Sequence, residues 1–508
     1  MSGPFGSSQW MYNADSGYEI TNSLRFENGD SAYLSQTLGT ATNNDKATFS
    51  CWIKRGNLSG NDKLITRYTD ANNRFYIAFQ AQDKLYVYSK ISGTTEIALY
   101  STQVFGDITA WYHVLVAMDT TQGTASNRIK IYVNGTRITD FSTETYPDQN
   151  QDLVLQSATN TALTIGSYDP SSTAQFYDGY MAEINFIDGA QKAPADFGET
   201  GDYGEWKPIK YAGTYGDNGY YLDFKSSGVG TAGSSTIGAD RSGNTNHWTS
   251  TNIVVTDQML DTPTNNFCTM NPLDNISSAY SEGNTKVAQS SYDYNSRGTI
   301  RLNSGKWYWE AFMAQAAGCF GVCESPKMPQ LDPLANYPAY FITDDGDSDD
   351  ASVRAANNAT GASITNKSPS GRFGNNKIVM IAYDADDGKL YYGVEGTWQL
   401  SADPAAGSNP LVSSISTRYG GAIVPFIGTT SSSATSKVVN FGQDSSFAGN
   451  KTAQGNADGN GVGDFFYAPP SGFLALCSKN LPEPTVVPSE NFNTVLYDGT
   501  GAGQTITG

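Results

Sequence analysis

The chain has 508 residues and a formal net charge of −19, and only 16% of its residues are charged. This length predicts two or three domains, and the acidic balance argues against nucleic acid as a partner, because phosphate binding needs clustered Lys and Arg. No apolar run reaches the roughly 18 residues of a membrane span. The abundance of Tyr, Phe and Gly favours pleated strands joined by tight turns, which predicts an all-β protein.

In chain order, residues 1–22 read as an extended arm with two large aromatic residues, Trp10 and Tyr12. Residues 23–196 then carry a series of short alternating runs separated by Gly, Asn, Asp and Thr. In ATFSCWIKR, Phe49 and Cys51 fall on one face of the strand and Ser50 falls on the other. Asn134-Gly135 is a strong hairpin signal between IKIYV and TRI. The pattern predicts an antiparallel β-sandwich.

Residues 197–290 are polar and rich in Gly and Ser, and we expect a connector with little core of its own that wraps on its neighbours. Residues 291–481 return to strand patterns and predict a second sandwich, with a hairpin turn at Asp387-Gly388. Residues 482–508 read as a linker followed by the start of a further β element.

Several motifs in residues 23–196 resemble the laminin-G-like, concanavalin A-like family of jelly-roll sandwiches. They are SLRFENGDSAYLS, FSCWIKR, WYHVLVAMD, IKIYVNG and LTIGSYDPSSTAQFYDGYMAEINFIDGA. Residues 291–481 resemble a SPRY-type sandwich through SGKWYWE, DDGKLYYGVEGTW, VPFIG, VVNFGQDSSF and PSGFLAL. These resemblances imply binding of glycans by the first domain and of peptides or proteins by the second.

Four further segments resemble virion proteins of marine tailed bacteriophages: MSGPFGSSQWMY, AEINFIDGAQKAPADFGE, YAGTYGDNGYYLDF and DRSGNTNHWT. This resemblance implies a tail-fibre or receptor-binding protein at the virion surface that contacts other virion proteins and a host-surface glycan or protein. By analogy with phage fibres it also implies a homotrimer. A capsid decoration protein and a glycan-degrading enzyme are the alternatives.

The enzyme alternative depends on a pair of carboxylates at a short, defined separation. The nearest candidates are Glu183 and Asp188, which lie five residues apart and therefore face opposite sides of a regular strand. The two histidines offer no catalytic triad: His113 lies inside an apolar strand pattern and His247 in a loop pattern. We therefore expect a non-catalytic protein.

Calcium is the cofactor that the sequence favours most, because hard cations bind clustered oxygen ligands. The run TDDGDSDD supplies the candidate ligands Asp344, Asp345, Asp347 and Asp349, followed by Asp350. A solvated acidic loop is the alternative. The five cysteines are scattered and odd in number, so we expect reduced, buried thiols and no zinc site.

Sugars stack on aromatic rings while Asn and backbone groups bond their hydroxyls, so aromatic residues next to turn residues are candidate glycan contacts. The candidates are Tyr68, Asn72, Asn73 and Tyr168 in the first domain and Trp398 in the second. Each aromatic residue has a core position as its alternative. In the arm, Trp10 and Tyr12 are the candidate virion anchor, because large aromatic side chains in a polar segment bury well only against a partner.

Overall fold

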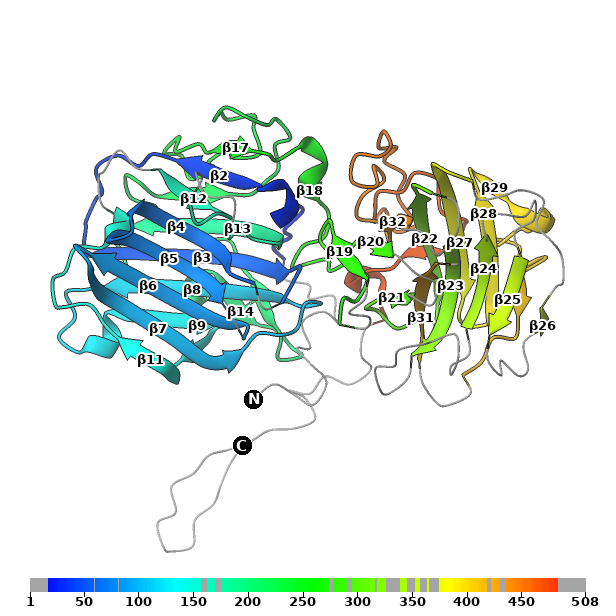
Figure 1. Ribbon diagram of the computed structural model, residues 1–508, viewed down its shortest axis with the longest axis horizontal. Helices are drawn as coiled ribbons and strands as arrows, with labels where there is room; N and C mark the ends of the chain where they lie inside the picture. Colours follow the sequence, from blue (N-terminus) through cyan, green and yellow to red (C-terminus); the bar gives the residue numbers. More distant parts are fainter. Residues whose placement is uncertain are drawn as a thin grey trace, which may run out of the picture.

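The computed structural model describes residues 17–482, except 59, 81, 157–161, 170–174, 274–277, 290–294, 316–317, 326–338, 345–351, 357–362, 365–373, 418–421 and 430–434. The described residues form two antiparallel β-sandwiches side by side, with short 3-10 turns and no α-helix (Figure 1). The predicted all-β fold of two sandwiches is confirmed. None of the described helices has the length and apolar character that crossing a bilayer requires.

The first sandwich consists of two sheets. We call the sheet built around β3 and β13 the back sheet and the other the front sheet, because the front sheet faces the viewer in Figure 1. The back sheet runs in the order β10 (Thr136–Ile138), β9 (Ile129–Val133), β8 (Trp111–Asp119), β3 (Lys46–Arg55), β13 (Gly179–Asp188), β1 (Ser23–Phe26) and β18 (Gln258–Met259), with β16 (Tyr220–Leu222) also on β13. The front sheet runs β11 (Phe141–Thr145), β7 (Thr94–Val104), β6 (Lys84–Ile91), β5 (Asn73–Gln80), β4 (Asp62–Asp70), β12 (Leu163–Ile165), β2 (Tyr33–Gln36) and β17 (Thr249–Thr251).

The second sandwich also has two sheets. One runs β19 (Ala279–Ser281), β20 (Lys286–Gln289), β32 (Thr435–Asn440), β22 (Lys306–Met313), β27 (Lys377–Asp384), β28 (Lys389–Val394), β30 (Val412–Ser413) and β26 (Ser363–Ile364), with β29 (Thr397–Trp398) on β28 and β33 (Leu474–Ala475) on β22. The other runs β21 (Asn295–Arg297), β31 (Ala422–Gly428), β23 (Gly318–Ser325), β24 (Ala339–Asp344) and β25 (Ser352–Ala356). The strands β14 (Gly198–Thr200) and β15 (Trp206–Pro208) form a separate pair. The 3-10 turns are Asn28–Asp30, Ala125–Asn127, Val154–Gln156, Pro194–Asp196, Val255–Asp257, Gln399–Ser401 and Ser478–Asn480.

Strand β3 shows how the sequence pattern becomes packing. Phe49 and Cys51 point into the core between the two sheets, as their alternation predicts. The opposite face of β3 is also buried, because the segment after residue 197 packs over the back sheet: Trp52 lies in a cluster with Met259, and Lys54 pairs with Asp261. A strand buried on both faces tolerates polar side chains only where each has a partner.

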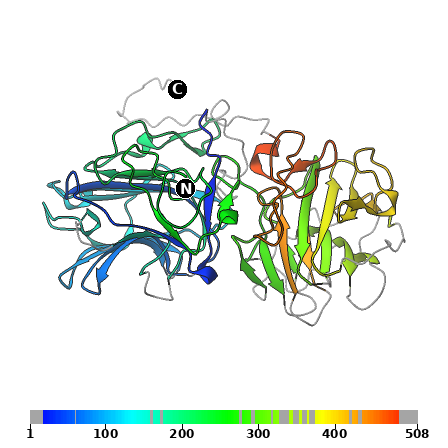
Figure 2. The same cartoon turned by 90° about the horizontal axis from the view of Figure 1, so that it is seen from above.

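The segment 197–290 therefore does more than join the sandwiches. It supplies β16 and β18 to the back sheet and β17 to the front sheet, and then β19 and β20 to the second sandwich. Figure 2 shows this green segment lying over the first sandwich and continuing into the second. The second sandwich accordingly begins before residue 291.

The two expected hairpin turns are both present. Strands β9 and β10 are joined by Asn134 and Gly135, which have φ values of 49° and 74°, so both adopt the left-handed conformation that a two-residue hairpin of this type requires. Strands β27 and β28 are joined by residues 385–388, and Gly388 has a φ of 60°. These turns fix the register of the strands on either side.

Candidate functional site

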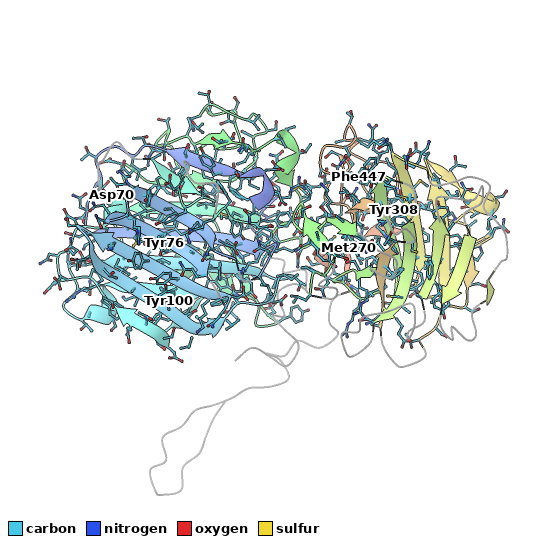
Figure 3. All side chains as sticks on the ribbon, in the orientation of Figure 1. Asp70, Tyr76, Tyr100, Met270, Tyr308 and Phe447 are labelled. Atoms are coloured by element: carbon cyan, nitrogen blue, oxygen red, sulfur yellow. The ribbon has the colours of Figure 1, made fainter. Side chains whose placement is uncertain are left out.

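The outer surface of the front sheet carries an unusual set of side chains. Along β5 and β6 the inward positions are apolar, for example Phe75, Ile77 and Val87, as a sandwich core requires. The outward positions, which usually carry polar side chains, carry tyrosines instead. We call this group of six tyrosines the tyrosine face: Tyr68, Tyr76, Tyr86, Tyr88, Tyr100 and Tyr168. Two of them, Tyr76 and Tyr100, are labelled in Figure 3 on the sheet that faces the viewer.

Strand register assembles the tyrosine face. Tyr76 on β5 is directly opposite Tyr88 on β6, and Tyr86 on β6 is directly opposite Tyr100 on β7. The Tyr76 and Tyr88 rings stack with centroids 5.1 Å apart, and the Tyr86 and Tyr100 rings stack at 3.3 Å. Tyr168, which follows β12, packs against Tyr68 at 5.0 Å and edge-on against Tyr76 at 5.7 Å. Cross-strand aromatic pairs of this kind stabilise a sheet as well as shaping its surface.

Small side chains lie between the rings. Ala78 and Ala98 occupy outward positions next to the tyrosines and are buried beneath them, so the surface alternates between rings and low points. The rings shield one another: only 8% of Tyr76 and 3% of Tyr86 is exposed. In Figure 1 no part of the described chain lies in front of this sheet. The result is an aromatic surface in which Tyr68, Tyr88, Tyr100 and Tyr168 are half-buried and Tyr76 and Tyr86 are buried between them.

Two cations are part of the tyrosine face. The Lys63 ammonium lies 4.8 Å from the centroid of the Tyr76 ring and 5.4 Å from that of Tyr168, and the Arg74 guanidinium lies 5.4 Å from that of Tyr88. Lys63 is 1% exposed, and its burial lowers the pKa of the ammonium to about 8. Both cations are favourably placed against the electron-rich ring faces.

A turn borders one end of the tyrosine face. The Asp70 carboxylate accepts hydrogen bonds from the backbone N–H groups of Asn72 and Asn73 and from the Asn73 side-chain amide, and these bonds lower the pKa of Asp70. The Asn73 side-chain oxygen accepts from Ser92 N at 2.9 Å, which ties the β4–β5 turn to the β6–β7 turn. Asn72 is exposed beside this junction.

The structure brings together four of the predicted glycan contacts. Tyr68 and Tyr168 belong to the tyrosine face, and Asn72 and Asn73 lie in the turn at its end. Trp398 lies apart from them in the second sandwich, where it is half-buried and packs edge-on against Tyr308 with centroids 6.4 Å apart. It forms part of a core cluster instead of an exposed platform.

Sequence reasoning missed the centre of the face, namely Tyr76, Tyr86, Tyr88 and Tyr100. The signal was present in KLYVYSK, where two tyrosines occupy alternate positions opposite the apolar Leu85 and Val87. A solvent-facing strand face made of repeated tyrosines departs from the usual polar pattern. What the sequence did not reveal is which strands pair, and pairing places the rings side by side.

The carboxylates considered for catalysis point in different directions. Glu183 sits at a β-bulge between Ala182 and Asn185, has a φ of 50°, and forms hydrogen bonds with the hydroxyls of Tyr18 and Tyr221 on the outer side of the back sheet. Asp188 accepts from the backbone N–H groups of Thr42 and Asn218 and from the Gln156 amide. Each carboxylate therefore serves a separate set of structural partners.

His113 is buried on the outer side of the back sheet. Its Nδ1 accepts a hydrogen bond from Trp206 Nε1 at 3.1 Å, so Nε2 carries the proton and donates to Ser50 Oγ at 2.8 Å. Burial lowers the pKa of the imidazole to about 3, which keeps it neutral. His113 is therefore a hydrogen-bonded structural residue. The His247 ring, in a loop, accepts from Asp240 N.

The five cysteines are all buried and form no disulfide, as expected. In the described part of the chain, no three His, Cys, Asp or Glu side chains gather as a metal ion requires. Asp344 ends β24, and Asp345, Asp347, Asp349 and Asp350 lie outside the described residues, so the calcium hypothesis remains a prediction. Trp10 and Tyr12 lie outside them as well.

Comparison with known families assigns the first sandwich. Residues 26–194 match the family model described as the concanavalin A-like lectin/glucanases superfamily. The two antiparallel sheets of this part of the chain are consistent with the concanavalin A-like jelly-roll fold that the match indicates. No curated protein matches the chain.

Solved structures with similar folds include a putative carbohydrate binding protein from Bacteroides ovatus, at 18% identity and a TM-score of 0.31, with 46% of this chain and 58% of that chain covered. A SAP-like pentraxin from Limulus polyphemus has 15% identity and a TM-score of 0.25, with 34% of this chain and 80% of that chain covered. The SPRY domain of human HERC1 has 11% identity and a TM-score of 0.23, with 34% and 96% covered. These values are low, so the fold assignment rests on the family match and on the sheets themselves.

Proposed function

We propose that this protein is a non-catalytic glycan-binding protein and that the tyrosine face is its binding surface. The observation that carries the proposal is the placement of six tyrosines on the solvent side of one sheet, arranged in cross-strand pairs and framed by a polar turn. Four of these tyrosines are half-buried at the surface, and tyrosine, which joins an apolar ring to a polar hydroxyl, is enriched at binding interfaces. The concanavalin A-like fold of this domain is compatible with the proposal.

Tyrosine suits sugar recognition in two ways. Its ring presents a flat apolar surface for the C–H face of a pyranose, and its hydroxyl exchanges hydrogen bonds with sugar hydroxyls. The rings here are rigid because they stack on one another, so little conformational entropy is lost when a ligand binds. Tyr100 donates to Gln80 at 3.1 Å, and Tyr88 contacts Thr95 at 3.2 Å, so the hydroxyls are already oriented by neighbours.

The biological setting that we propose is the surface of a phage virion, where the protein would act as a tail-fibre or receptor-binding component recognising a host glycan or protein. The support is the resemblance of four sequence segments to such virion proteins. Assembly as a homotrimer would multiply weak individual sites through avidity. Electron microscopy of purified virions, with this protein labelled, tests the proposed location. We expect the label on tail fibres, and label confined to capsid faces would favour a decoration protein.

Binding is tested by truncating the centre of the tyrosine face. We expect Tyr76→Ala combined with Tyr88→Ala to weaken glycan binding at least tenfold, which is about 1.4 kcal/mol. Isothermal titration against polysaccharides extracted from the host surface provides the measurement. Tyr132→Ala is the matched control, because this half-buried tyrosine lies on the back sheet. Equal losses in both proteins would contradict the proposal, as would sugar release by the wild-type protein during incubation.

A further inference from the structure

Charge on the tyrosine face differs in sign from the charge of the whole protein. The outward positions of β4, β5 and β6, read from their register, are Lys63, Thr66, Tyr68, Arg74, Tyr76, Ala78, Gln80, Lys84, Tyr86, Tyr88 and Lys90. They include four Lys or Arg residues, and the acidic groups of this side of the sheet lie at its margins: Asp70 ends β4, and Glu96 precedes Ala98 at the outward positions of β7. The chain as a whole has 50 acidic and 31 basic residues, so this face is a local reversal of charge.

From this reversal we infer that the tyrosine face binds an acidic glycan, one whose sugars carry carboxylate or sulfate groups. The inference rests on the proposed function and names the class of ligand. Aromatic rings interleaved with cations provide both halves of such recognition: the rings contact the sugar faces, and the cations attract the acidic groups. A neutral glycan would use only the rings.

Among the described residues, the cations of this face are not held in ion pairs. Some buried cations at other sites are paired with carboxylates, as Lys54 is with Asp261 and Arg55 is with Asp62, whereas the buried Lys437 bonds Gln289 and Thr435. Within the described ranges, Lys63, Arg74, Lys84 and Lys90 form no ion pair with a carboxylate. Asp70 is the nearest acidic group in sequence to Arg74 and is attracted by its charge, but the oxygens of Asp70 bond the backbone and amide N–H groups of its own turn.

Lys63 strengthens the argument because a buried ammonium is costly unless something compensates its charge. Here the rings of Tyr76 and Tyr168 lie against the ammonium and compensate its charge partly, together with the neighbouring carboxylate of Asp62. An acidic group lying on the rings would feel this charge through a medium of low dielectric, where electrostatic attraction is stronger than in water. Arg74, Lys84 and Lys90 are half-buried and offer charge at the surface itself.

The test compares ligands that differ in charge. Polygalacturonate, a sulfated galactan, a neutral galactan and a single-stranded oligonucleotide are titrated against the full-length protein at about 50 mM and about 500 mM salt, because screening weakens the attraction between exposed charges. We expect the two acidic glycans to bind at least tenfold more tightly than the neutral galactan at low salt and to lose most of that advantage at high salt. Equal affinity for acidic and neutral galactans would overturn the inference and leave the proposed function intact.

Variants test which side chains attract the acidic groups of the glycan. Lys84→Gln combined with Lys90→Gln is expected to weaken binding of the acidic glycans about tenfold, while binding of the neutral galactan stays unchanged, because both lysines lie on β6 outside the stacked rings. Lys225→Gln is the control, because this exposed lysine lies on the segment over the back sheet. An unchanged acidic-glycan affinity in the double variant would overturn the inference. Tighter binding of the oligonucleotide than of any glycan would overturn both the inference and the proposed function.

Discussion

Two buried glutamates show how differently the same side chain can be satisfied. Glu183 shares three short contacts with two tyrosine hydroxyls: Tyr18 to Glu183 at 2.8 Å, Tyr221 to Glu183 at 2.6 Å, and Tyr18 to Tyr221 at 2.9 Å. Two hydroxyls supply two protons for these three contacts, whereas a protonated carboxyl supplies the third. The triangle therefore fits the neutral acid, which agrees with a pKa raised to about 7 by burial.

Glu310 in the second sandwich is surrounded by donors instead. It accepts from the backbone N–H groups of Phe466 and Tyr467, from the Tyr308 hydroxyl and from the Asn440 amide. Burial raises the pKa of Glu310 to about 7 as well, while these four donors oppose the shift. A carboxylate is the species that such a set of donors fits.

The first residue-scale prediction concerns pH. The pKa of Glu183 is raised above its value of 4.5 in the unfolded chain, so the folded protein binds the extra proton, and this stabilisation is present below about pH 4.5 and is lost as pH rises through 7. Glu183→Gln keeps the hydrogen bonds without a titrating proton. Relative to wild type, we expect the variant to gain about 3 kcal/mol of unfolding free energy between pH 4.5 and pH 8.

Urea unfolding across this pH range measures the effect of Glu183→Gln. The other titratable groups that act on Glu183 are Tyr18, Tyr215, Tyr221, Asp223 and Lys225. Glu310→Gln is the contrasting variant. The N–H groups of the new amide would face the donors that now bond Glu310, so we expect the unfolding free energy to fall by about 1–3 kcal/mol at pH 8. If the unfolding free energy of Glu183→Gln changed with pH in the same way as that of wild type, the assignment of a proton to Glu183 would be contradicted.

At the scale of elements, the β9–β10 hairpin is held from outside as well as by its own turn. Gly135 has a φ of 74°, and a Cβ atom there would lie 2.5 Å from Trp206 Cζ3 on β15. The same indole donates to His113, so the separate β14–β15 pair is anchored to the back sheet. A local turn signal in the sequence thus also marks a long-range contact.

Gly135→Ala tests this contact. The substitution forces a side chain into left-handed backbone, which costs about 1 kcal/mol, and it displaces the indole, which costs roughly another 1–3 kcal/mol. Gly204→Ala is the matched control, since Gly204 has a φ of 82° with open space around it. We expect the thermal midpoint to fall further for Gly135→Ala than for Gly204→Ala. We also expect the intensity of Trp fluorescence in the folded protein to change only in Gly135→Ala. Equal shifts would show that only the turn matters.

At the scale of the whole molecule, buried ion pairs join the two sandwiches. Arg25 on β1 is 1% exposed and contacts Asp257, Glu282 and Asp444, the last two in the second sandwich. Nearby, Lys54 Nζ lies 2.7 Å from Asp261 and 2.7 Å from the Asn266 side-chain oxygen. These bonds cross from the back sheet to the segment that enters the second sandwich, so the two units are held in one orientation.

Lys54→Met tests this junction. Removal of the cation leaves Asp261 buried without its charge partner, which costs about 3–5 kcal/mol. We expect calorimetry of the full-length protein to show a lowered transition that splits as the sandwiches unfold separately. Lys46→Met is the control: Lys46 is partly exposed, its nitrogen lies 3.5 Å from Asp119, and the pair lies within one sandwich, so a loss below about 1 kcal/mol is expected. A single, unsplit transition in Lys54→Met would contradict the coupling.

The amino-acid sequence by itself determined the fold class and most strands, because period-two alternation and the turn residues Asn134-Gly135 and Asp387-Gly388 are local signals that need no knowledge of pairing. It also located the edge of the candidate site, through Tyr68 and Tyr168, since each lies beside turn residues. The assignment of the first sandwich likewise rests on sequence, through the family match.

Only the tertiary structure decided what covers each face. The alternation in β3 predicts a buried face and a polar face, yet both are buried, because a segment about 200 residues further along the chain packs over Lys54. The tyrosine face arises in the same way: Tyr76, Tyr88 and Tyr168 become one surface only when β5, β6 and the end of β12 are brought together. Register and layer order are set by contacts between residues distant in sequence, and no local pattern encodes them.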